Sequence, residues 1–261
     1  DTTGVKYLIL DEADRMLDMG FYDDIMTIAK SLPTIRQTLL FSATMPLKIR
    51  DLANKLLKNP ENISIAISKP ADGITQEAYM CYDHQKVKLV RTILNDKGKN
   101  LSHVLIFASS IKSVREITRT LNKAGMRASE MHSGLNQQQR EKTIREFKNK
   151  TIKILVATDI LSRGIDIKGI ELVINYEVPY DAEDYVHRIG RTARADKTGE
   201  AITLINNNQV NDFVNIEKLI EKKVPKLKLP KGFDTGPEYK ILAKKKKWKK
   251  KWKFSKGSKQ S

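Results

Sequence analysis

Short apolar runs alternate along this chain with stretches in which apolar residues recur every three or four positions. A run of four to eight apolar residues is typical of a buried strand, and the wider spacing is typical of a helix with one buried face. Before residue 68 the pattern predicts strands at 5–10, 38–41 and 63–67, with helices at 21–32 and 47–57. Strands that alternate with helices favour a parallel sheet covered by helices.

Residues 68–74 contain Lys, Pro, Asp and Gly and interrupt this pattern, which predicts a linker. After it the alternation restarts and runs longer. The predicted strands lie at 77–82, 103–107, 128–131, 152–157, 172–176 and 201–205, and the predicted helices at 85–95, 111–124, 137–148, 182–195 and 209–222. We therefore expect an α/β protein with one complete domain at 75–230. The first unit, 1–67, has three strands and begins without Met, so we expect the rear part of a truncated domain.

The formal charge of the chain is +17, and more than half of it lies near the end. Residues 231–261 hold 12 Lys against two acids, which leaves +10 there and +7 in the first 230 residues. This tail has little periodic apolar sequence, so we expect it to be disordered, with the folded part ending near Pro230. Excess positive charge favours a polyanionic partner, nucleic acid first and an anionic membrane surface second.

The composition disfavours membrane-spanning and secreted proteins. No apolar stretch approaches the roughly 20 residues of a membrane helix, and no basic-then-apolar signal pattern opens the sequence. Cys81 is the single cysteine, so it cannot form a disulfide within the chain. We expect a globular protein that acts in the cytoplasm.

Two polar clusters directly follow predicted strands, where parallel sheets place ligand sites. Asp11-Glu12-Ala13-Asp14 follows the first strand. One acid there can hold Mg²⁺, largely through water, while its neighbour orients or deprotonates an attacking water. Helix capping with acids in the first turn explains the same four residues equally well. Ser42-Ala43-Thr44 follows the next strand and could transmit a hydrogen-bonding change, although a capping turn is the simpler interpretation.

Residues 185–194 (YVHRIGRTAR) place His187, Arg191 and Arg194 on one face of a predicted helix. Crowding cations on one side of a helix is costly unless an anion meets them. Arginine grips phosphate oxygens with two nitrogens and neutralises a transferring phosphoryl group. These residues therefore indicate a phosphate site more than a solvated basic face.

Residues 156–166 (VATDILSRGID) place several polar residues just past a buried strand. Gly164 lacks a side chain and permits close approach of the backbone, which suits a phosphate or sugar contact.

Together these segments resemble DEAD-box ATP-dependent RNA helicases of superfamily 2 over about residues 4–225. The matching motifs occur in order: DEAD at 11–14, SAT at 42–44, LIF at 105–107, Gln137-x-x-Arg140, ATD and RGID within 157–166, and HRIGRTAR at 187–194. The resemblance implies RecA-like parallel sheets, ATP and Mg²⁺ as cofactors, and RNA-stimulated ATP hydrolysis coupled to local opening of short duplexes.

The resemblance also implies a role for each matching residue on the ATP side. Asp11 is similar to the acid that coordinates Mg²⁺ through water, and Glu12 to the general base for the hydrolytic water. Asp166 would contact the ribose of ATP. Arg191 and Arg194 would reach the γ-phosphate as arginine fingers when the two domains close.

Other matching residues imply coupling and RNA contact. Asp14, Ser42 and Thr44 resemble the set that couples the ATP site to the second domain through His187 and Arg188. Contacts to phosphates and 2′-hydroxyls would favour RNA without reading its sequence. On the RNA side, Ser110, Gly134, Arg140 and Thr158 would hold the backbone together with Gly164, and Arg163 would link the RNA and nucleotide sites.

Three departures from the family pattern bear on activity. Ala193 replaces a glycine, and Ser109-Ser110 replaces the more usual Asn-Thr. The sequence contains no G-x-x-x-x-G-K-[ST] loop, and the glutamine motif that would read adenine is also absent. Without a loop to cradle the β- and γ-phosphates, we expect this polypeptide alone to have negligible ATPase activity.

Residues 244–254 (KKKKWKKKWKF) interleave aromatic side chains with lysines. Phosphates attract lysines, and bases stack on Trp248 and Trp252, which predicts a sequence-independent RNA tether. A solubility role, a protein contact or an anionic membrane surface would use the same features.

We therefore expect single-stranded and short duplex RNA as partners, ribonucleoprotein complexes as possible surroundings, no membrane partner and a monomeric chain. A non-catalytic module that binds or anneals RNA is the alternative function. A DNA-directed enzyme of the same superfamily is the third option.

Overall fold

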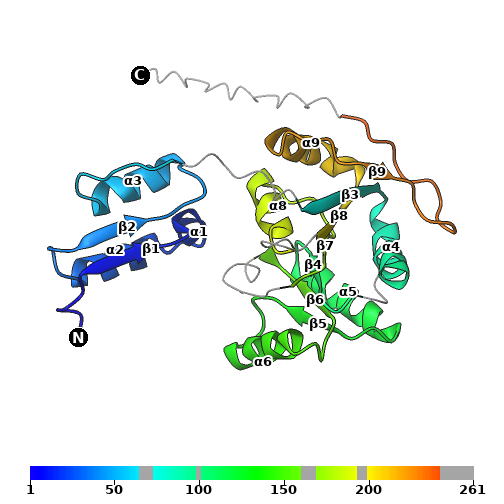
Figure 1. The fold of residues 1–261 in the computed structure, drawn as a ribbon, viewed down its shortest axis with the longest axis horizontal. Helices are drawn as coiled ribbons and strands as arrows, with labels where there is room; N and C mark the ends of the chain where they lie inside the picture. Colours follow the sequence, from blue (N-terminus) through cyan, green and yellow to red (C-terminus); the bar gives the residue numbers. More distant parts are fainter. Residues whose placement is uncertain (65–72, 98–100, 160–168, 193–198, 242–261) are drawn as a thin grey trace, which may run out of the picture. The chain divides into compact units, whose positions relative to one another are not determined.

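The computed structural model describes residues 1–64, 73–97, 101–159, 169–192 and 199–241. It divides the chain into two compact units, Asp1–Lys69 and Pro70–Ser261, and the division falls inside the range expected as a linker. The elements of each unit are labelled in Figure 1.

The first unit is a small parallel α/β layer. Its strands β1 (Tyr7–Leu10) and β2 (Gln37–Leu40) pair in parallel, with Leu10 opposite Leu40. Its helices are α1 (Ala13–Asp18), α2 (Tyr22–Ser31) and α3 (Leu47–Leu56). Successive side chains of a strand point to opposite faces, so Leu10 packs in the core while Tyr7 and Ile9 are exposed.

Two expectations for this unit need correction. The pattern did not predict α1, which begins directly after Glu12 and has only six residues. The expected strand at 63–67 does not begin where predicted, since Ile63 and Ser64 lie outside any strand. The rest of that range lies outside the described residues.

The second unit is a seven-stranded parallel sheet in the order β5-β6-β4-β7-β8-β3-β9. Its strands are β3 (Ile74–Met80), β4 (Val104–Phe107), β5 (Ala128–Met131), β6 (Ile154–Ala157), β7 (Leu172–Asn175), β8 (Gly199–Ile205) and β9 (Lys226–Leu227). Its helices are α4 (Asp83–Asp96), α5 (Ile111–Lys123), α6 (Gln137–Lys148), α8 (Ala182–Ile189) and α9 (Val210–Leu219), with a short η2 (Asn207–Gln209).

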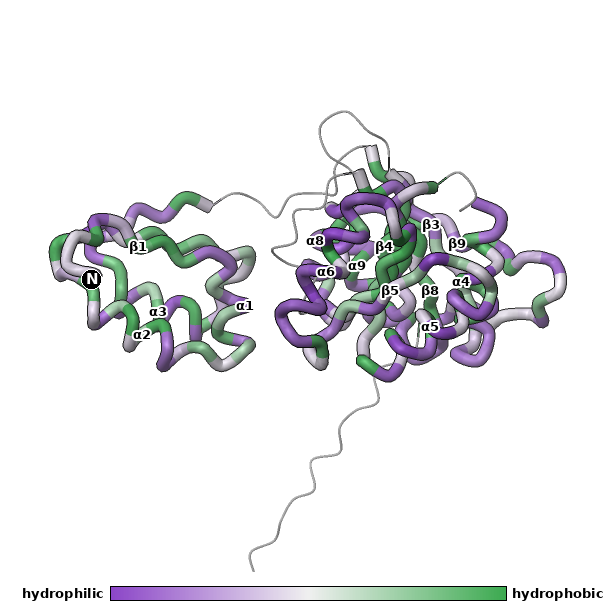
Figure 2. The backbone as a smooth tube through the Cα atoms, turned by 90° about the horizontal axis from the view of Figure 1, so that it is seen from below, coloured by the Kyte–Doolittle hydropathy of each residue, from purple (hydrophilic) through white to green (hydrophobic). Residues whose placement is uncertain are grey.

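The central strands are apolar because helices cover both of their faces. Every residue of β4, β6 and β7 is buried, and Figure 2 shows hydrophobic colour along β4. Successive residues of a strand enter different cores. Ile106 of β4 packs with Val114 and Ile117 of α5, whereas Phe107 packs with Phe147 of α6.

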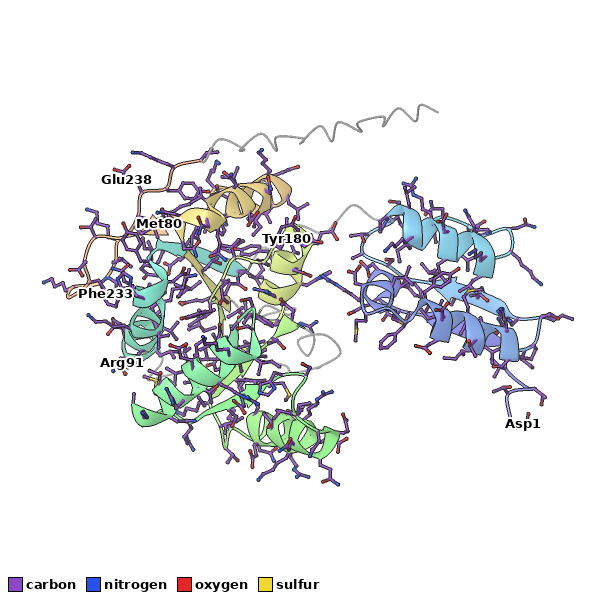
Figure 3. The ribbon with its side chains drawn as sticks, turned by 180° about the vertical axis from the view of Figure 1, so that it is seen from behind. Asp1, Met80, Arg91, Tyr180, Phe233 and Glu238 are labelled. Atoms are coloured by element: carbon purple, nitrogen blue, oxygen red, sulfur yellow. The ribbon has the colours of Figure 1, made fainter. Side chains whose placement is uncertain are left out.

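Residues 226–241, here called the strap, form the last described segment and pack on the second unit. After β9 pairs with β3, the strap loops out beside α4 and returns past α9 (Figure 1). Lys88 Nζ donates to Gly232 O (2.6 Å), and Gln85 Nε2 donates to Asp234 O (3.1 Å). Phe233 packs against the core; Met80 and Phe233 are labelled in Figure 3.

Glu217 of α9 anchors the returning part of the strap. It is 3% exposed and accepts hydrogen bonds from the Tyr239 hydroxyl (3.0 Å), the Val224 amide (2.8 Å) and the Lys226 ammonium. Burial opposes ionisation, but the bonds from Lys226, Val224 and Tyr239 outweigh it and hold the pKa of Glu217 below its usual range. The boundary expected near Pro230 is therefore wrong, because residues 231–241 belong to the fold.

Candidate functional site

In the first unit, hydrogen bonds join the segments that follow β1 and β2. The Asp14 amide donates to Ser42 Oγ (3.2 Å), and Ser42 Oγ donates to Thr44 O (2.7 Å). Asp14 Oδ2 accepts from both the Thr44 amide (3.2 Å) and the Thr44 hydroxyl (3.1 Å). Asp14 is 9% exposed, and these hydrogen bonds hold its carboxylate in place. The structure thus brings together the three residues expected to act as a set.

Asp11 and Glu12 lie at the carboxyl end of β1 with an unusual backbone. Glu12 adopts the left-handed conformation (φ 51°, ψ 46°), which is rare for a residue with a side chain. Such conformations concentrate at functional sites. Glu12 also occupies the N-cap of α1, but its side chain makes no capping hydrogen bond. Helix capping by Glu12 therefore does not explain this residue.

The Asp11 carboxylate receives the Glu12 amide on Oδ1 (2.9 Å). It is exposed and offers oxygen, the ligand atom that Mg²⁺ prefers. No group of three or more His, Cys, Asp or Glu side chains among the described residues could hold a metal by itself. Proteins bind Mg²⁺ through one or two carboxylates, and the ion keeps phosphate and water as its other ligands.

In the second unit, backbone bonds continue past the strand ends and hold the motif loops at one edge of the sheet. The Thr158 amide donates to Met131 O (3.1 Å), and the Ala108 amide donates to Ala157 O (2.9 Å). The Tyr176 amide donates to Phe107 O (2.9 Å). The segments after β5, β6, β4 and β7 therefore lie side by side at the carboxyl edge, where parallel sheets bind ligands.

Arg188 of α8 is a buried cation that ties these segments together. Its Nε donates to Asp159 Oδ1 (2.6 Å), and its Nη2 donates to Asp159 Oδ2. Its Nη1 donates to Asn175 Oδ1 (3.2 Å) and Glu177 O (3.3 Å), and its guanidinium lies 5.1 Å from the centre of the Phe107 ring. All of these partners belong to the second unit. We interpret Arg188 as the residue that positions α8 against the loop after β6.

The expected helix over 182–195 ends early, at Ile189. The Arg191 and Thr192 amides bond only three residues back, to Arg188 O (3.2 Å) and Ile189 O (3.0 Å). Thr192 Oγ1 donates to Ile170 O (2.7 Å) and holds this turn against the sheet. A Cβ on Gly199 would lie 2.3 Å from Thr192 Oγ1, so only glycine fits there.

Because of this turn, the expectation that the cations of residues 185–194 share one helical face needs correction. His187 lies on α8 and is partly buried, whereas Arg191 lies beyond the helix in the turn. Arg194 lies outside the described residues. Helical spacing therefore does not relate Arg191 to His187.

The four residues expected to hold the RNA backbone lie in or beside these edge segments. Ser110 caps α5, since its Oγ accepts from the Ser113 amide (3.1 Å). Thr158 is 8% exposed, and Arg140 Nη2 donates to Ser133 O (3.1 Å). Gly134 donates its amide hydrogen to His132 Nδ1 (3.1 Å), so that hydrogen is already engaged.

Several expected site residues cannot be placed. Arg163, Gly164, Asp166, Arg194, Trp248 and Trp252 lie outside the described residues.

Some buried polar residues at this edge escaped the sequence reasoning. Lys86 is 1% exposed, with Nζ 3.0 Å from Asp83 Oδ1 and 5.6 Å from the centre of the Tyr176 ring. Glu177 accepts the Ser109 amide (3.0 Å), and burial raises the pKa of Glu177. Lys86 and Glu177 both come after strands. Their position just past a strand was the signal in the sequence that could have marked them as candidate site residues.

Comparisons with known proteins agree with the motif series. The helicase conserved C-terminal domain matches residues 85–196, and the DEAD/DEAH box helicase family matches residues 1–52. The DEAD-box ATP-dependent RNA helicase CshA of Bacillus licheniformis is 39% identical over 227 residues, which cover 87% of this chain and 46% of CshA. RhpA of Helicobacter pylori, also a DEAD-box ATP-dependent RNA helicase, is 39% identical to this chain, and the match covers 46% of RhpA. The chain thus spans about half the length of these curated relatives.

A solved structure of S. cerevisiae Dbp5 bound to RNA and ADP BeF3 matches with a TM-score of 0.79 at 28% identity. The match covers 87% of this chain and 60% of the Dbp5 chain. Together with the helix-covered parallel sheet, it shows a RecA-like fold.

Proposed function

Because the chain belongs to the DEAD-box helicase family, we propose that the protein is an ATP-dependent RNA helicase that uses ATP hydrolysis to open short RNA duplexes. The observation that carries the proposal is the network of Asp14, Ser42 and Thr44 beside Asp11 and Glu12. It joins the acidic end of β1 to the segment after β2. A movement of Asp11 or Glu12 can therefore be transmitted to the segment that follows β2.

Asp11 is the residue of this chain that we propose for Mg²⁺. Its carboxylate suits water-mediated coordination, and the bound ion would neutralise charge on the phosphates of ATP. Glu12 stands next to it on a strained backbone, exposed to solvent, where its carboxylate can orient a water and take its proton. Arg191 lies in the turn after α8, and we propose that its side chain contacts the γ-phosphate of ATP.

RNA is the proposed partner, and its proposed surface is the carboxyl edge of the second sheet. Gly134, Thr158 and Ser110 follow β5, β6 and β4, and backbone hydrogen bonds hold the ends of these strands next to one another. Arg188 fixes α8 against the same edge. These groups suit contacts to phosphate and sugar, which carry no sequence information.

The test is a chimera in which the first-domain segment of B. licheniformis CshA that precedes the matched region is joined ahead of Asp1. We expect RNA-stimulated ATPase activity from the chimera. Glu12→Gln should lower the turnover rate by about 10²-fold or more, since general base catalysis contributes typically 10²–10⁴-fold. RNA affinity should stay unchanged in that variant.

The unmodified CshA and its equivalent Glu→Gln variant are the matched controls. The 261-residue chain alone, which contains no phosphate-cradling loop, should bind RNA without hydrolysing ATP. An active chimera whose rate is the same with Glu12→Gln contradicts the proposed role of Glu12. RNA binding and strand annealing with no ATPase activity in a folded chimera would favour the non-catalytic module instead.

A further inference from the structure

One loop of the second unit is approached by arginines from two helices. The loop meant here is His132, Ser133 and Gly134, which directly follow β5 in the connection to α6. Arg140 of α6 donates from Nη2 to Ser133 O (3.1 Å). Arg115 of α5 reaches the other end, because a Cβ placed on Gly134 would lie 3.9 Å from Arg115 Nη2. Two guanidinium groups beside one tripeptide repel each other unless an anion lies near them.

Unsatisfied donors beneath the same loop point to an acceptor as its partner. His132 is fully buried, and its Nδ1 accepts the Gly134 amide, so the ring carries its hydrogen on Nε2. Within the described part of the chain, His132 Nε2 and Arg140 Nε are buried without a hydrogen-bond partner. Glu130 Oε1 lies 3.5 Å from His132 Nε2, beyond normal hydrogen-bond length. A buried donor without an acceptor is unfavourable, since it has lost its hydrogen bonds to water.

Arg115 also belongs to a basic face of α5. Lys112, Arg115 and Arg119 are exposed, and their spacing of three and four residues places them on one side of the helix. The opposite side, with Val114, packs in the core. A phosphate over the loop could thus be followed by further backbone phosphates along α5. A guanidinium fork matches phosphate oxygens geometrically.

We infer that Arg115 is an additional RNA-phosphate ligand, which shares with Arg140 a phosphate lying over the His132–Gly134 loop. The inference rests on the proposed function, since it assumes that RNA binds this edge. Gly134 has a direct part in it. A Cβ there would press on the His132 ring at 3.2 Å and stand between Arg115 and the loop.

Salt dependence of binding to a labelled oligouridylate tests the inference in the full chain. Arg115→Gln should weaken binding roughly threefold to tenfold and lower the log–log salt slope by about 0.7, the value of one single-strand phosphate contact. Arg140→Gln should behave similarly. Arg91→Gln is the matched control, since Arg91 is exposed on α4 (Figure 3) and should change neither quantity.

Photocrosslinking gives a second, positional readout. Cys81 is the single native cysteine, is fully buried and has a thiol pKa raised by burial to about 11, so an introduced cysteine can be labelled selectively. Arg115→Cys and Arg140→Cys carrying an azidophenyl group should crosslink to RNA, and Arg91→Cys should not.

The outcomes separate the inference from the proposed function. Crosslinking from position 140 but not 115, with an unchanged slope for Arg115→Gln, overturns the role of Arg115 and leaves the RNA edge standing. RNA binding with no crosslink or slope change at either position overturns the proposed RNA surface itself. Crosslinks and lowered slopes at both positions support both.

Discussion

Arg188 places a positive charge where only 5% of the residue is exposed. Charges are seldom buried unless they are paired and hydrogen-bonded. Here Asp159 supplies both carboxylate oxygens, and Asn175 and the Glu177 carbonyl occupy Nη1. Two segments distant from each other in sequence, at Asp159 and at 175–177, therefore converge on one side chain, which makes Arg188 a positioning residue for the edge loops.

Replacing Arg188 with alanine should destabilise the second unit. Removing one partner of a buried pair costs about 3–5 kcal/mol, and the lower end applies because the Asp159 side chain is 42% exposed. The free energy of unfolding, measured in urea by circular dichroism, should fall by about 3 kcal/mol. Asp159→Asn should cost less, since the amide still accepts one hydrogen bond.

Arg91→Ala controls for loss of an exposed arginine and should change the free energy of unfolding by less than about 0.5 kcal/mol. If Arg188→Ala costs no more than Arg91→Ala, the cluster does not hold the edge together. The sequence alone placed Arg188 in a phosphate-binding motif, but its burial depends on Asp159 and Asn175. Their proximity arises only from the strand order.

At the scale of elements, the strap turns the end of the chain into part of the sheet. β9 pairs with only two residues of β3, so strand pairing alone would hold it weakly. Tyr239 adds a hydrogen bond to the Glu217 carboxylate. The Phe233 ring adds a contact with Lys88, whose ammonium lies 4.5 Å from the ring centre. Gly236 allows the backbone of the strap to run close to Met80, since a Cβ at position 236 would lie 2.1 Å from Met80 O.

Truncation should therefore reveal two different segments. Ending the chain after Pro230 removes Phe233 and Tyr239 and should lower the stability of the second unit by about 3 kcal/mol, a Tm decrease of roughly 6–12 °C. Ending it after Ile241 keeps the strap and should leave the Tm unchanged. Differential scanning calorimetry measures both.

Gly236→Ala in the full chain is the matched point variant and should reproduce most of the decrease by forcing the strap away from Met80. Equal Tm values for the two truncated chains would mean that the strap contributes nothing to the fold.

The predicted elements succeeded where burial alone decides structure. The apolar runs of β4, β6 and β7 are buried on both faces, so their local sequence already specifies strands. Predictions failed where tertiary contacts decide. β9 has two residues and, among the described strands, pairs only with β3. α8 ends at Ile189, before the turn that Thr192 holds through its bond to Ile170 O. Neither contact leaves a periodic signal in the sequence.

The same distinction holds for the candidate site. The motifs led to Asp14, Ser42 and Thr44, which the structure brings together. They did not reveal that His132 engages the Gly134 amide, because that bond depends on the turn geometry after β5.

At the scale of the whole molecule, the excess positive charge near the end of the chain lies after the strap. Residues 231–241 contain two Lys and two acids and are neutral, so the +10 of the tail belongs entirely to residues 242–261. That lysine-rich segment lies outside the described residues, and it follows directly on a strap fixed to α9. No helix among the described residues is long and apolar enough to span a membrane. The ten lysines of this segment predict that it supplies a sequence-independent part of RNA affinity.

Deleting residues 242–261 should flatten the salt dependence of RNA binding without changing the Tm. Each phosphate neutralised on a single strand contributes about 0.7 to the log–log slope, so losing several of ten lysines should lower the slope by about 3–6. Replacing Trp248 and Trp252 with alanine should instead keep the slope and weaken binding equally at all salt concentrations, by about 1–3 kcal/mol for each lost stack. Fluorescence anisotropy over a salt series separates the two effects. A slope that survives the deletion would show that the folded edge, and not the lysine-rich segment, supplies the electrostatic affinity.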